Sequence, residues 1–219
     1  RRWIKNNNGC RIQILNKRGG FMFSNLNEIL KDLKEGKIVC LSDTEDLENE
    51  IDMCCLAEFA TPQNINYMAT HAKGFICDVL PDLICKVKGI DYLEQKGLNQ
   101  DHRGTPFAAF LDLATCDTGI SAFERSETIL ELSMSDKDLT HFVQGHTPVL
   151  HAKHGLLSDR KGHTEMSAQL SYLAGNNGTA VICEVLNTDG HMLRVNQFEE
   201  WNKDNGLKLY SLSQMLKDI

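Results

Sequence analysis

The 219-residue sequence lacks several features that would place it in particular classes of protein. No apolar run approaches the ~18 residues that a membrane-spanning helix needs, and no apolar stretch follows the basic residues 1–5, so we expect neither a membrane span nor an intact signal peptide. Lysine and arginine (23) are outnumbered by aspartate and glutamate (30), which gives a net charge of −7. This charge argues against nucleic acid or an anionic membrane as the main partner.

The sequence also lacks a cysteine pattern of known function. It contains no Cys-x-x-Cys pair, and the spacing of its cysteines matches no zinc module. Several cysteines lie in apolar, strand-like runs, where a free thiol behaves as a small hydrophobic side chain. We therefore expect reduced thiols and a cytoplasmic protein. The eight cysteines are Cys10, Cys40, Cys54, Cys55, Cys77, Cys85, Cys116 and Cys183.

The order of helical and strand patterns predicts an α+β fold. The chain length fits one large domain, no internal repeat or linker divides it, and helices and strands mix without strict alternation. We predict an N-terminal arm at residues 1–23, with one strand at Cys10 to Leu15, and a single domain at 24–219 with a mixed sheet flanked by helices. Residues 81–105 are polar and are expected to form a long, mobile active-site loop.

The most unusual stretch of the chain is acidic and runs from Asp43 to Asp52. It holds six carboxylates in ten residues and follows directly on the apolar run 38–41, which is typical of a buried strand. Glu48, Glu50 and Asp52 alternate, so in an extended segment they point the same way. One such face can hold a divalent ion and keep a carboxylate free to move protons. The alternative is a solvated acidic loop.

A second polar cluster, residues 159–165, immediately precedes a predicted helix. The N–H groups at a helix N-terminus, with Arg160 and Thr164 beside them, favour a bound phosphate. His163 at the same place can ligate a metal or move a proton. The acidic stretch and this cluster together indicate a magnesium-assisted enzyme acting on a sugar phosphate.

Three further residues each allow two interpretations. Glu184 stands alone in an apolar strand-like run, either as a functional carboxylate or at an outward-facing position. His146 is a general acid/base or a polar turn residue. Cys77 is a core thiol or lines the pocket. The histidines His71, His102, His141 and His191 are expected at the surface.

In combination, these segments resemble the 3,4-dihydroxy-2-butanone 4-phosphate synthases of riboflavin biosynthesis. The matching pieces follow the family order over roughly residues 25–218. They are Asp46-x-Glu48-Asn49-Glu50-x-Asp52, Ala57-Glu58-x-x-Thr61, Gly74-x-x-Cys77, Thr118-Gly119-Ile120-Ser121-Ala122-x-x-Arg125, Gly145-His146, Arg160-x-Gly162-His163-Thr164-Glu165, Leu173-Ala174-Gly175 and Ile182-Cys183-Glu184.

The resemblance implies one α+β domain that forms a homodimer with active sites near the subunit interface. It implies conversion of D-ribulose 5-phosphate to L-3,4-dihydroxy-2-butanone 4-phosphate and formate with Mg²⁺, or Mn²⁺ as an alternative ion, through an enediolate. Carried over to this sequence, the implied roles are metal ligation by Glu48 and His163; acid/base catalysis by His146, Glu184, Glu50 and Asp52; and substrate binding by Asp43, Glu48, Asp52, Cys77, Arg160, Gly162, His163, Thr164 and Glu184.

The sequence departs from the family pattern at a few positions close to these residues. Leu47 stands where the family has Arg, Ile51 where it has Gly, and Thr44 where it has Asp; Ala108 replaces a Thr, and Pro148 is shifted by one position. Leu47 removes a cation that would contact the substrate, and Ile51 adds a side chain that we expect to narrow the acidic loop. The alternative function is therefore a weakly active or inactive homologue that binds a sugar phosphate or a partner protein.

Overall fold

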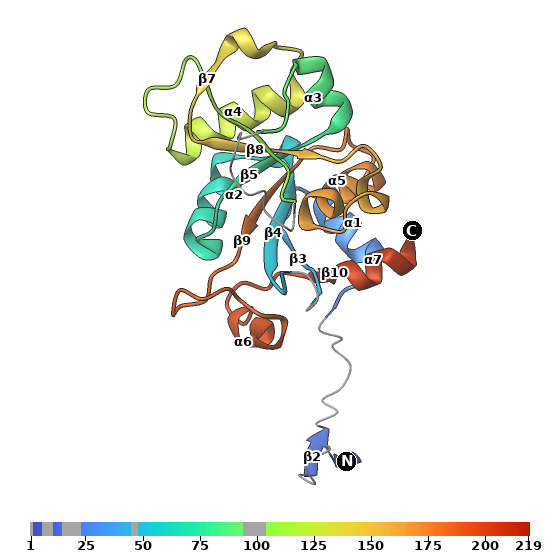
Figure 1. Cartoon of the computed structure of the whole chain (residues 1–219). Coiled ribbons are helices and arrows are strands. Elements are labelled where there is room, and N and C mark those ends of the chain that lie inside the picture. The colour runs from blue at the N-terminus through green and yellow to red at the C-terminus, as the bar shows by residue number, and fades with distance from the viewer. Residues whose placement is uncertain (1, 6–10, 15–22, 45–47, 94–103) are drawn as a thin grey trace.

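The computed structural model describes all residues except 1, 6–10, 15–22, 45–47 and 94–103. Its centre is an eight-stranded mixed sheet with strand order β10-β3-β4-β9-β5-β8-β6-β7 (Figure 1). The pairs β10–β3 and β5–β8 are parallel and the other neighbours are antiparallel. The strands are β3 (Val39–Ser42), β4 (Ile51–Leu56), β5 (Cys77–Pro81), β6 (Phe107–Leu113), β7 (Phe142–Gln144), β8 (Thr147–Ala152), β9 (Ala180–Glu184) and β10 (Leu209–Ser211).

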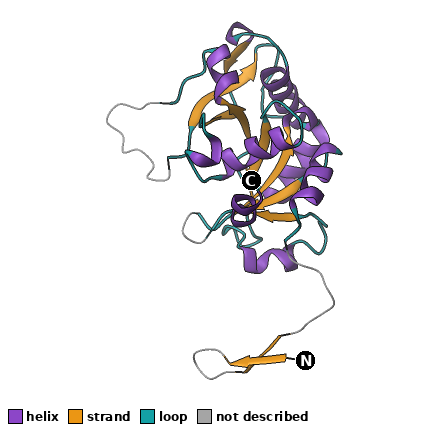
Figure 2. Ribbon diagram, turned by 90° about the vertical axis from the view of Figure 1, so that its right-hand side faces the viewer, coloured by secondary structure: helices purple, strands orange, loops and turns teal. Residues whose placement is uncertain are grey.

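Helices cover both faces of this sheet (Figures 1 and 2). One face packs against α1 (Leu26–Lys34), α5 (His163–Leu173) and α7 (Leu212–Asp218). The other packs against α2 (Pro62–Tyr67), the π-helical turn η2 (Met68–Ala72), α4 (Ala122–Met134) and α6 (Phe198–Trp201). Short 3-10 turns complete the chain at η1 (Ala57–Phe59), η3 (Leu139–His141), η4 (Leu156–Ser158) and η5 (Val195–Gln197). The α+β prediction is confirmed.

The strand sequences supply both apolar layers because successive side chains point to opposite faces. Val39 and Leu41 join the core under α1 and α5, whereas Cys40 between them joins the core under α2 and α4. Cys54 and Cys55 likewise divide between the two layers. Every cysteine in the described part of the chain is a free thiol, as predicted, and all but Cys116 are buried.

Capping residues explain where several helices begin. Asn25, Ser121 and Ser211 each accept a hydrogen bond from the third residue of the helix that follows, and that residue's side chain bonds back to the cap. These reciprocal bonds satisfy N–H groups that the first helical turn leaves without partners. At Ser211 the sequence itself shows this arrangement as the pattern Ser-x-x-Gln. Among the helices described, none has the length and apolar character needed to cross a bilayer.

Two details of the predicted organisation need correction. The expected long loop at 81–105 begins instead with α3 (Asp82–Lys88), which Gly89 ends in a left-handed conformation. This helix is short, and its apolar residues Leu83 and Val87 are exposed, so its sequence shows no clear apolar stripe. Residues 94–103 lie outside the described part. The expected arm contains two strands rather than one, since β1 (Arg2–Lys5) pairs antiparallel with β2 (Arg11–Ile14).

The directions of the strands bring the candidate site residues to the same edge of the sheet. β3 and β9 end at this edge, where β4, β5 and β8 begin, as the pairs Ser42–Ile51, Asp52–Glu184 and Cys77–Ile182 show. The acidic stretch connects β3 to β4 here, so its carboxylates lie beside Glu184. The start of α5 packs over the same strands.

Candidate functional site

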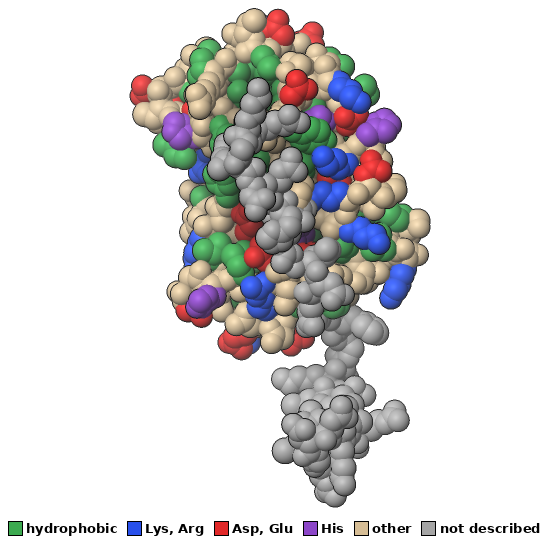
Figure 3. Space-filling view, viewed as in Figure 1, with side chains coloured by type: hydrophobic (Ala, Val, Ile, Leu, Met, Phe, Trp, Pro, Cys, Tyr) green, Lys and Arg blue, Asp and Glu red, His purple; other side chains and the backbone are tan. Residues whose placement is uncertain are grey.

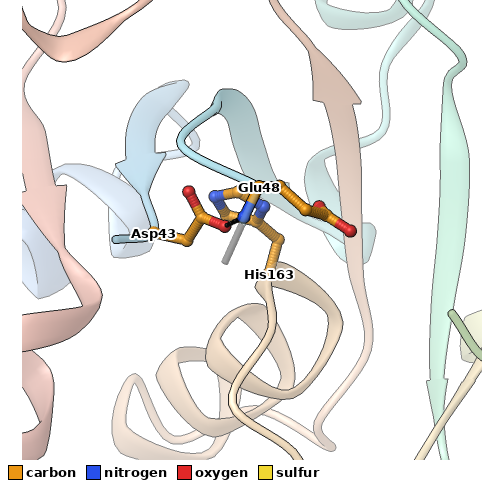
Figure 4. Close-up of side chains that lie close together, drawn as sticks. All are labelled: Asp43, Glu48 and His163. Carbon is orange, nitrogen blue, oxygen red and sulfur yellow. Dashed lines mark hydrogen bonds between the residues drawn. The ribbon is translucent and has the colours of Figure 1, made fainter. Parts of the chain in front are cut away.

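Three ligand-type side chains converge at this edge of the sheet. Asp43, Glu48 and His163 each place one ligand atom within 4.8 Å of the others (Figure 4). Asp43 and Glu48 come from the loop between β3 and β4, and His163 is the first residue of α5. Two carboxylates and an imidazole form a donor set that suits a divalent ion such as Mg²⁺ or Mn²⁺. The structure thus brings the two predicted metal ligands together and adds Asp43, which we had predicted as a substrate contact.

Asp43 also shapes the loop that carries Glu48. One of its carboxylate oxygens accepts the backbone N–H of Glu48 at 2.6 Å and the other accepts that of Glu50 at 2.8 Å. These two bonds fix the backbone of Glu48 and Glu50 relative to the end of β3.

Asp52 lies beneath the cluster and is almost fully buried. Its Oδ2 is 3.6 Å from His163 Nδ1. Within the described residues, Asp52 Oδ1 and His163 Nε2 have no hydrogen-bond partner, which is unusual for buried polar atoms and consistent with a ligand at this place. Burial, with the neighbouring charge of Glu184, raises the pKa of Asp52 well above its usual range, and burial lowers the pKa of His163. These shifts favour the neutral form of both side chains.

Glu184 is held at the end of β9 by the chain that precedes β5. Its Oε2 accepts the backbone N–H of Phe75 at 2.7 Å. This contact requires Gly74, because a Cβ there would lie 2.2 Å from the Glu184 carbonyl oxygen and 2.7 Å from Oε2. The structure therefore places the single acid of this apolar strand beside the cluster, in register with Asp52. Nearby, burial and then Glu48 raise the pKa of Glu50.

The second predicted cluster forms the beginning of α5. Gly162 occupies the N-cap without a side-chain cap bond, so the first N–H groups of the helix face outward from its end. A Cβ at Gly162 would lie 2.1 Å from Arg160 Nη1, so glycine lets this guanidinium lie against the helix start. Arg160 also donates to Glu165, which is fully buried, at 2.7 Å. Thr164 is buried in the first turn.

Basic side chains surround this part of the surface. In the space-filling view, lysine and arginine side chains lie around the position of α5, next to acidic side chains in the middle of the same face (Figure 3). An anion at the helix start would therefore meet positive charge, while a cation would be attracted to the adjacent carboxylates.

His146 belongs to a separate group on the same edge. Its Nδ1 lies 2.7 Å from Asp112 Oδ2, and its backbone N–H donates to Asp112 Oδ1 at 2.8 Å. A Cβ at Gly119 or Gly145 would lie 1.8 or 2.0 Å from the Asp112 carboxyl group, so both glycines make room for it. With Nδ1 bonded to a carboxylate, Nε2 of the half-exposed imidazole is the atom available to a substrate.

The distance along the sheet separates His146 from the metal cluster. β4, β9, β5 and β8 are successive neighbours, and His146 immediately precedes β8. Three strand spacings therefore lie between Asp52 and His146, or roughly 14 Å. The predicted site residues thus form two groups, which lie at the same edge but are not in contact.

Three remaining predictions concern Cys77, Ile51 and Leu47. Cys77 lies in the core at the start of β5, where its thiol donates to the Phe75 carbonyl and burial raises its pKa well above the usual range. The expected narrowing of the acidic loop by Ile51 is wrong: Ile51 is fully buried in the core under α2 and α4, on the face opposite Asp52. Leu47 lies outside the described residues.

Sequence reasoning missed two residues of this region. Asp112 is a lone acid in the apolar run 107–113, the same signal that drew attention to Glu184. Arg194 lies far along the chain, yet its guanidinium donates to the main-chain oxygens of Glu48 and Asn49. No local sequence pattern indicates that a side chain bonds to backbone oxygens far away in the chain.

The fold and the site define an α+β protein with an acid-rich cluster of possible metal ligands at the edge of a mixed sheet. The profile of the 3,4-dihydroxy-2-butanone 4-phosphate synthase family matches residues 27–218, and the chain belongs to this family of riboflavin biosynthesis. The riboflavin biosynthesis protein RibBA of Bacillus subtilis (strain 168) is 39% identical over 197 residues, which are 90% of this chain and 49% of that protein. The chain spans about half the length of the curated relatives it matches.

Solved structures agree with this assignment. The chain is similar to a 3,4-dihydroxy-2-butanone 4-phosphate synthase in complex with two magnesium ions (TM-score 0.82, 28% identity, 90% of this chain and 96% of that one). It is similar to the synthase of Candida albicans (TM-score 0.80, 31% identity, 90% and 97%). It also matches RibBX, a two-domain synthase from A. baumannii (TM-score 0.81, 34% identity, 88% and 57%).

Proposed function

We propose that this protein converts D-ribulose 5-phosphate to L-3,4-dihydroxy-2-butanone 4-phosphate and formate with the help of Mg²⁺. The observation that carries the proposal is the meeting of Asp43, Glu48 and His163 beside the buried Asp52 and Glu184. The crystal structure of a relative with two magnesium ions supports the choice of ion, with Mn²⁺ as a substitute.

The chemistry needs a metal and several proton carriers. Removing a proton next to a carbonyl builds negative charge on substrate oxygens, which bound Mg²⁺ would stabilise. Glu48, His163 and Asp43 are the residues that would hold this ion. Asp43 in addition keeps the loop in place, because both of its oxygens accept N–H groups of that loop.

The proton transfers fall to the carboxylates around the cluster. A skeleton that loses one carbon as formate must take up and release protons at more than one atom, so a single base is not sufficient. Burial is the main cause of the raised pKa values of Glu50 and Asp52, and a raised pKa suits a carboxyl group to accept and release protons. Glu184 is fixed by Phe75 and faces the same side of the sheet as Asp52, so it contacts the substrate and completes the set.

The phosphate of the substrate would bind at the start of α5. The outward N–H groups of the first turn, the hydroxyl group of Thr164 and the guanidinium of Arg160 offer the donors that a phosphate needs. Gly162 allows the close approach of Arg160. A phosphate here would place the rest of a five-carbon sugar beside His163, and Cys77 would form part of the wall on the β5 side.

In this proposal the protein is a homodimer, and His146 of one subunit acts at the metal cluster of the other. It lies three strands from Asp52, too far to reach atoms held at the cluster of its own chain. Exposed apolar side chains flank it: Val143 is the register partner of Asp112, and Ile120 follows Gly119, which packs against Asp112. Such a patch beside a polar dyad suits a subunit contact that carries His146 to the partner's cluster.

Formate release from ribulose 5-phosphate tests the activity directly. The purified protein is expected to release formate with Mg²⁺, to stop when EDTA is added, and to be inactive as His163→Ala. An inactive wild-type protein that is folded and binds metal would exclude the synthase and favour the alternative, a homologue that binds a sugar phosphate or a partner protein. Leu47→Arg distinguishes these cases, since recovery of formate release would show that only the lost cation prevents activity.

Mixing two inactive variants tests the dimer. His146→Ala and His163→Ala chains, unfolded together and refolded, are expected to recover about a quarter of wild-type activity, because half of the dimers would be mixed and each would have one intact site. Each variant refolded alone serves as the control. No recovery in dimers shown to be mixed would place His146 outside the partner's site.

A further inference from the structure

Arg194 donates hydrogen bonds to the backbone of the acidic loop. It lies between β9 and η5, and its Nη1 donates to the carbonyl oxygen of Glu48 at 2.9 Å and to that of Asn49. These two bonds come from a residue 146 and 145 positions further along the chain. They therefore tie the C-terminal part of the protein to the loop that carries a predicted metal ligand.

Side chains thus bond to both the N–H groups and the C=O groups of the backbone of this loop. Asp43 accepts the N–H groups of Glu48 and Glu50, and Arg194 donates to the C=O groups of Glu48 and Asn49. Asn49 between them has a positive φ of 54°, a conformation that asparagine adopts more readily than most residues. The hydrogen bonds from Asp43 and Arg194 to the backbone on either side of Asn49 stabilise this turn.

Backbone hydrogen bonds connect the segment that carries Arg194 to the sheet. The N–H of Val185 donates to the Ile51 carbonyl and the N–H of Leu193 donates to the Val185 carbonyl, both at 2.8 Å. Leu193 is fully buried, and the backbone N–H of Arg194 donates to Gln197 Oε1 at 3.0 Å. The reach of the guanidinium is therefore set by β4 and β9, the strands that carry Asp52 and Glu184.

We propose that Arg194 is a positioning residue that holds the Glu48 carboxylate in place for a divalent cation, acting through backbone carbonyls and touching neither ion nor substrate. This inference rests on the proposed metal-dependent function, but the bonds that carry it belong to the chain alone. Residues that orient metal ligands typically affect metal affinity by 10- to 100-fold.

Because Arg194 is positively charged, the direction in which its removal changes metal affinity distinguishes between its possible roles. A positive charge near a cation site repels the ion, so if Arg194 acted only by charge, its removal would tighten metal binding. A role in folding alone would lower the stability of the metal-free protein and leave the affinity unchanged. A clamp on the loop predicts weaker binding.

The test compares Arg194→Met and Arg194→Lys with the wild-type protein. Lys203→Met serves as the control, because Lys203 is an exposed cation of the same C-terminal segment that pairs with Glu200. Amide hydrogen exchange over residues 43–52 of the metal-free proteins reports the loop, and a Mn²⁺ titration reports the site. Because exchange needs neither ion nor substrate, it remains informative if the proposed activity fails.

In Arg194→Met we expect the amides of Glu48 and Glu50 to exchange at least about tenfold faster, and Mn²⁺ to bind about tenfold more weakly. Arg194→Lys keeps the charge but lacks the planar fork, so it is expected to recover only part of the affinity. Lys203→Met should match the wild type. Unchanged loop exchange, or Mn²⁺ affinity that is unchanged or higher in Arg194→Met, would overturn the proposal.

Discussion

Asp52 and Glu184 lie directly opposite each other across the antiparallel strands β4 and β9. Carboxylates in this relation repel each other, and a like-charge pair of this kind destabilises a sheet by roughly 0.2–1 kcal/mol. Burial and then the charge of Glu184 raise the pKa of Asp52, the buried member of the pair. The site thus places two acidic groups side by side, and this arrangement lowers the stability of the fold.

Glu184→Gln is expected to raise stability while it lowers activity. Glutamine keeps an oxygen that can accept the N–H of Phe75, but it removes the charge opposite Asp52. We expect the metal-free protein to gain roughly 0.5–1 kcal/mol in urea unfolding at pH 7, and formate release to fall by roughly 10²–10⁴-fold. Glu199→Gln, an exposed change on α6, should alter neither. A loss of stability in Glu184→Gln would contradict this account of the pair.

Variants of the Arg160–Glu165 ion pair are expected to separate the contribution of Arg160 to stability from its contribution to activity. Glu165 is fully buried and Arg160 is its charged partner at 2.7 Å. Arg160→Met leaves that carboxyl group without its cation and should destabilise the protein by about 3 kcal/mol, the scale for breaking a buried ion pair.

Adding Glu165→Gln to that variant should restore most of the stability, because glutamine is neutral and can still accept the N–H of Lys153. Formate release should stay low in the double variant, since the phosphate would still lack Arg160. Urea unfolding and the formate assay on the two variants measure both quantities. A double variant with recovered activity would show that Arg160 serves the fold and not the substrate.

Asp78 gives the protein a pH-dependent stability outside the site. It is fully buried in β5, where the hydroxyl of Ser133 donates to both of its oxygens, at 2.9 and 3.0 Å. Burial raises its pKa to about 8. The folded protein therefore binds this proton more tightly than the unfolded chain does, and stability should fall as the pH rises from the ordinary carboxyl pKa of about 4 to about 8.

Asp78→Asn should remove this contribution, since the amide carries no titratable proton and its oxygen can accept from Ser133. The free energy of unfolding, measured in urea at pH 5, 6.5 and 8, is expected to fall more steeply in the wild type than in the variant. Parallel curves would show that Asp78 does not titrate in this range.

Much of the fold follows from local patterns in the sequence. The apolar run 38–41, the apolar run around Glu184 and the helix expected after residues 159–165 each predict an element of the correct type, which are β3, β9 and α5. α3 was missed because it is short and two of its apolar side chains, Leu83 and Val87, are exposed, so its sequence shows no clear apolar stripe. The pairing order of the sheet could be inferred only from the family resemblance, because strand neighbours such as β4 and β9 are far apart in the chain.

The candidate site was predictable where its residues are unusual in their surroundings. Carboxylates at the end of an apolar strand and a histidine at a helix start are visible in sequence, and the structure joins them. Contacts that depend on tertiary packing were not visible. Arg194 reaches the loop from the C-terminal segment, and Ile51 turned out to point into the core.

The most direct test of the account is the dependence of formate release on added Mg²⁺ in wild type, Glu48→Gln and Glu58→Gln. Glu58 is an exposed carboxylate that bonds Asn176 outside the cluster. We predict saturable activation by Mg²⁺ in the wild type and in Glu58→Gln, and at least about tenfold weaker activation in Glu48→Gln. Formate release that is equal in all three proteins, or that persists without a divalent ion, would contradict the assignment of the Asp43–Glu48–His163 cluster as the metal site.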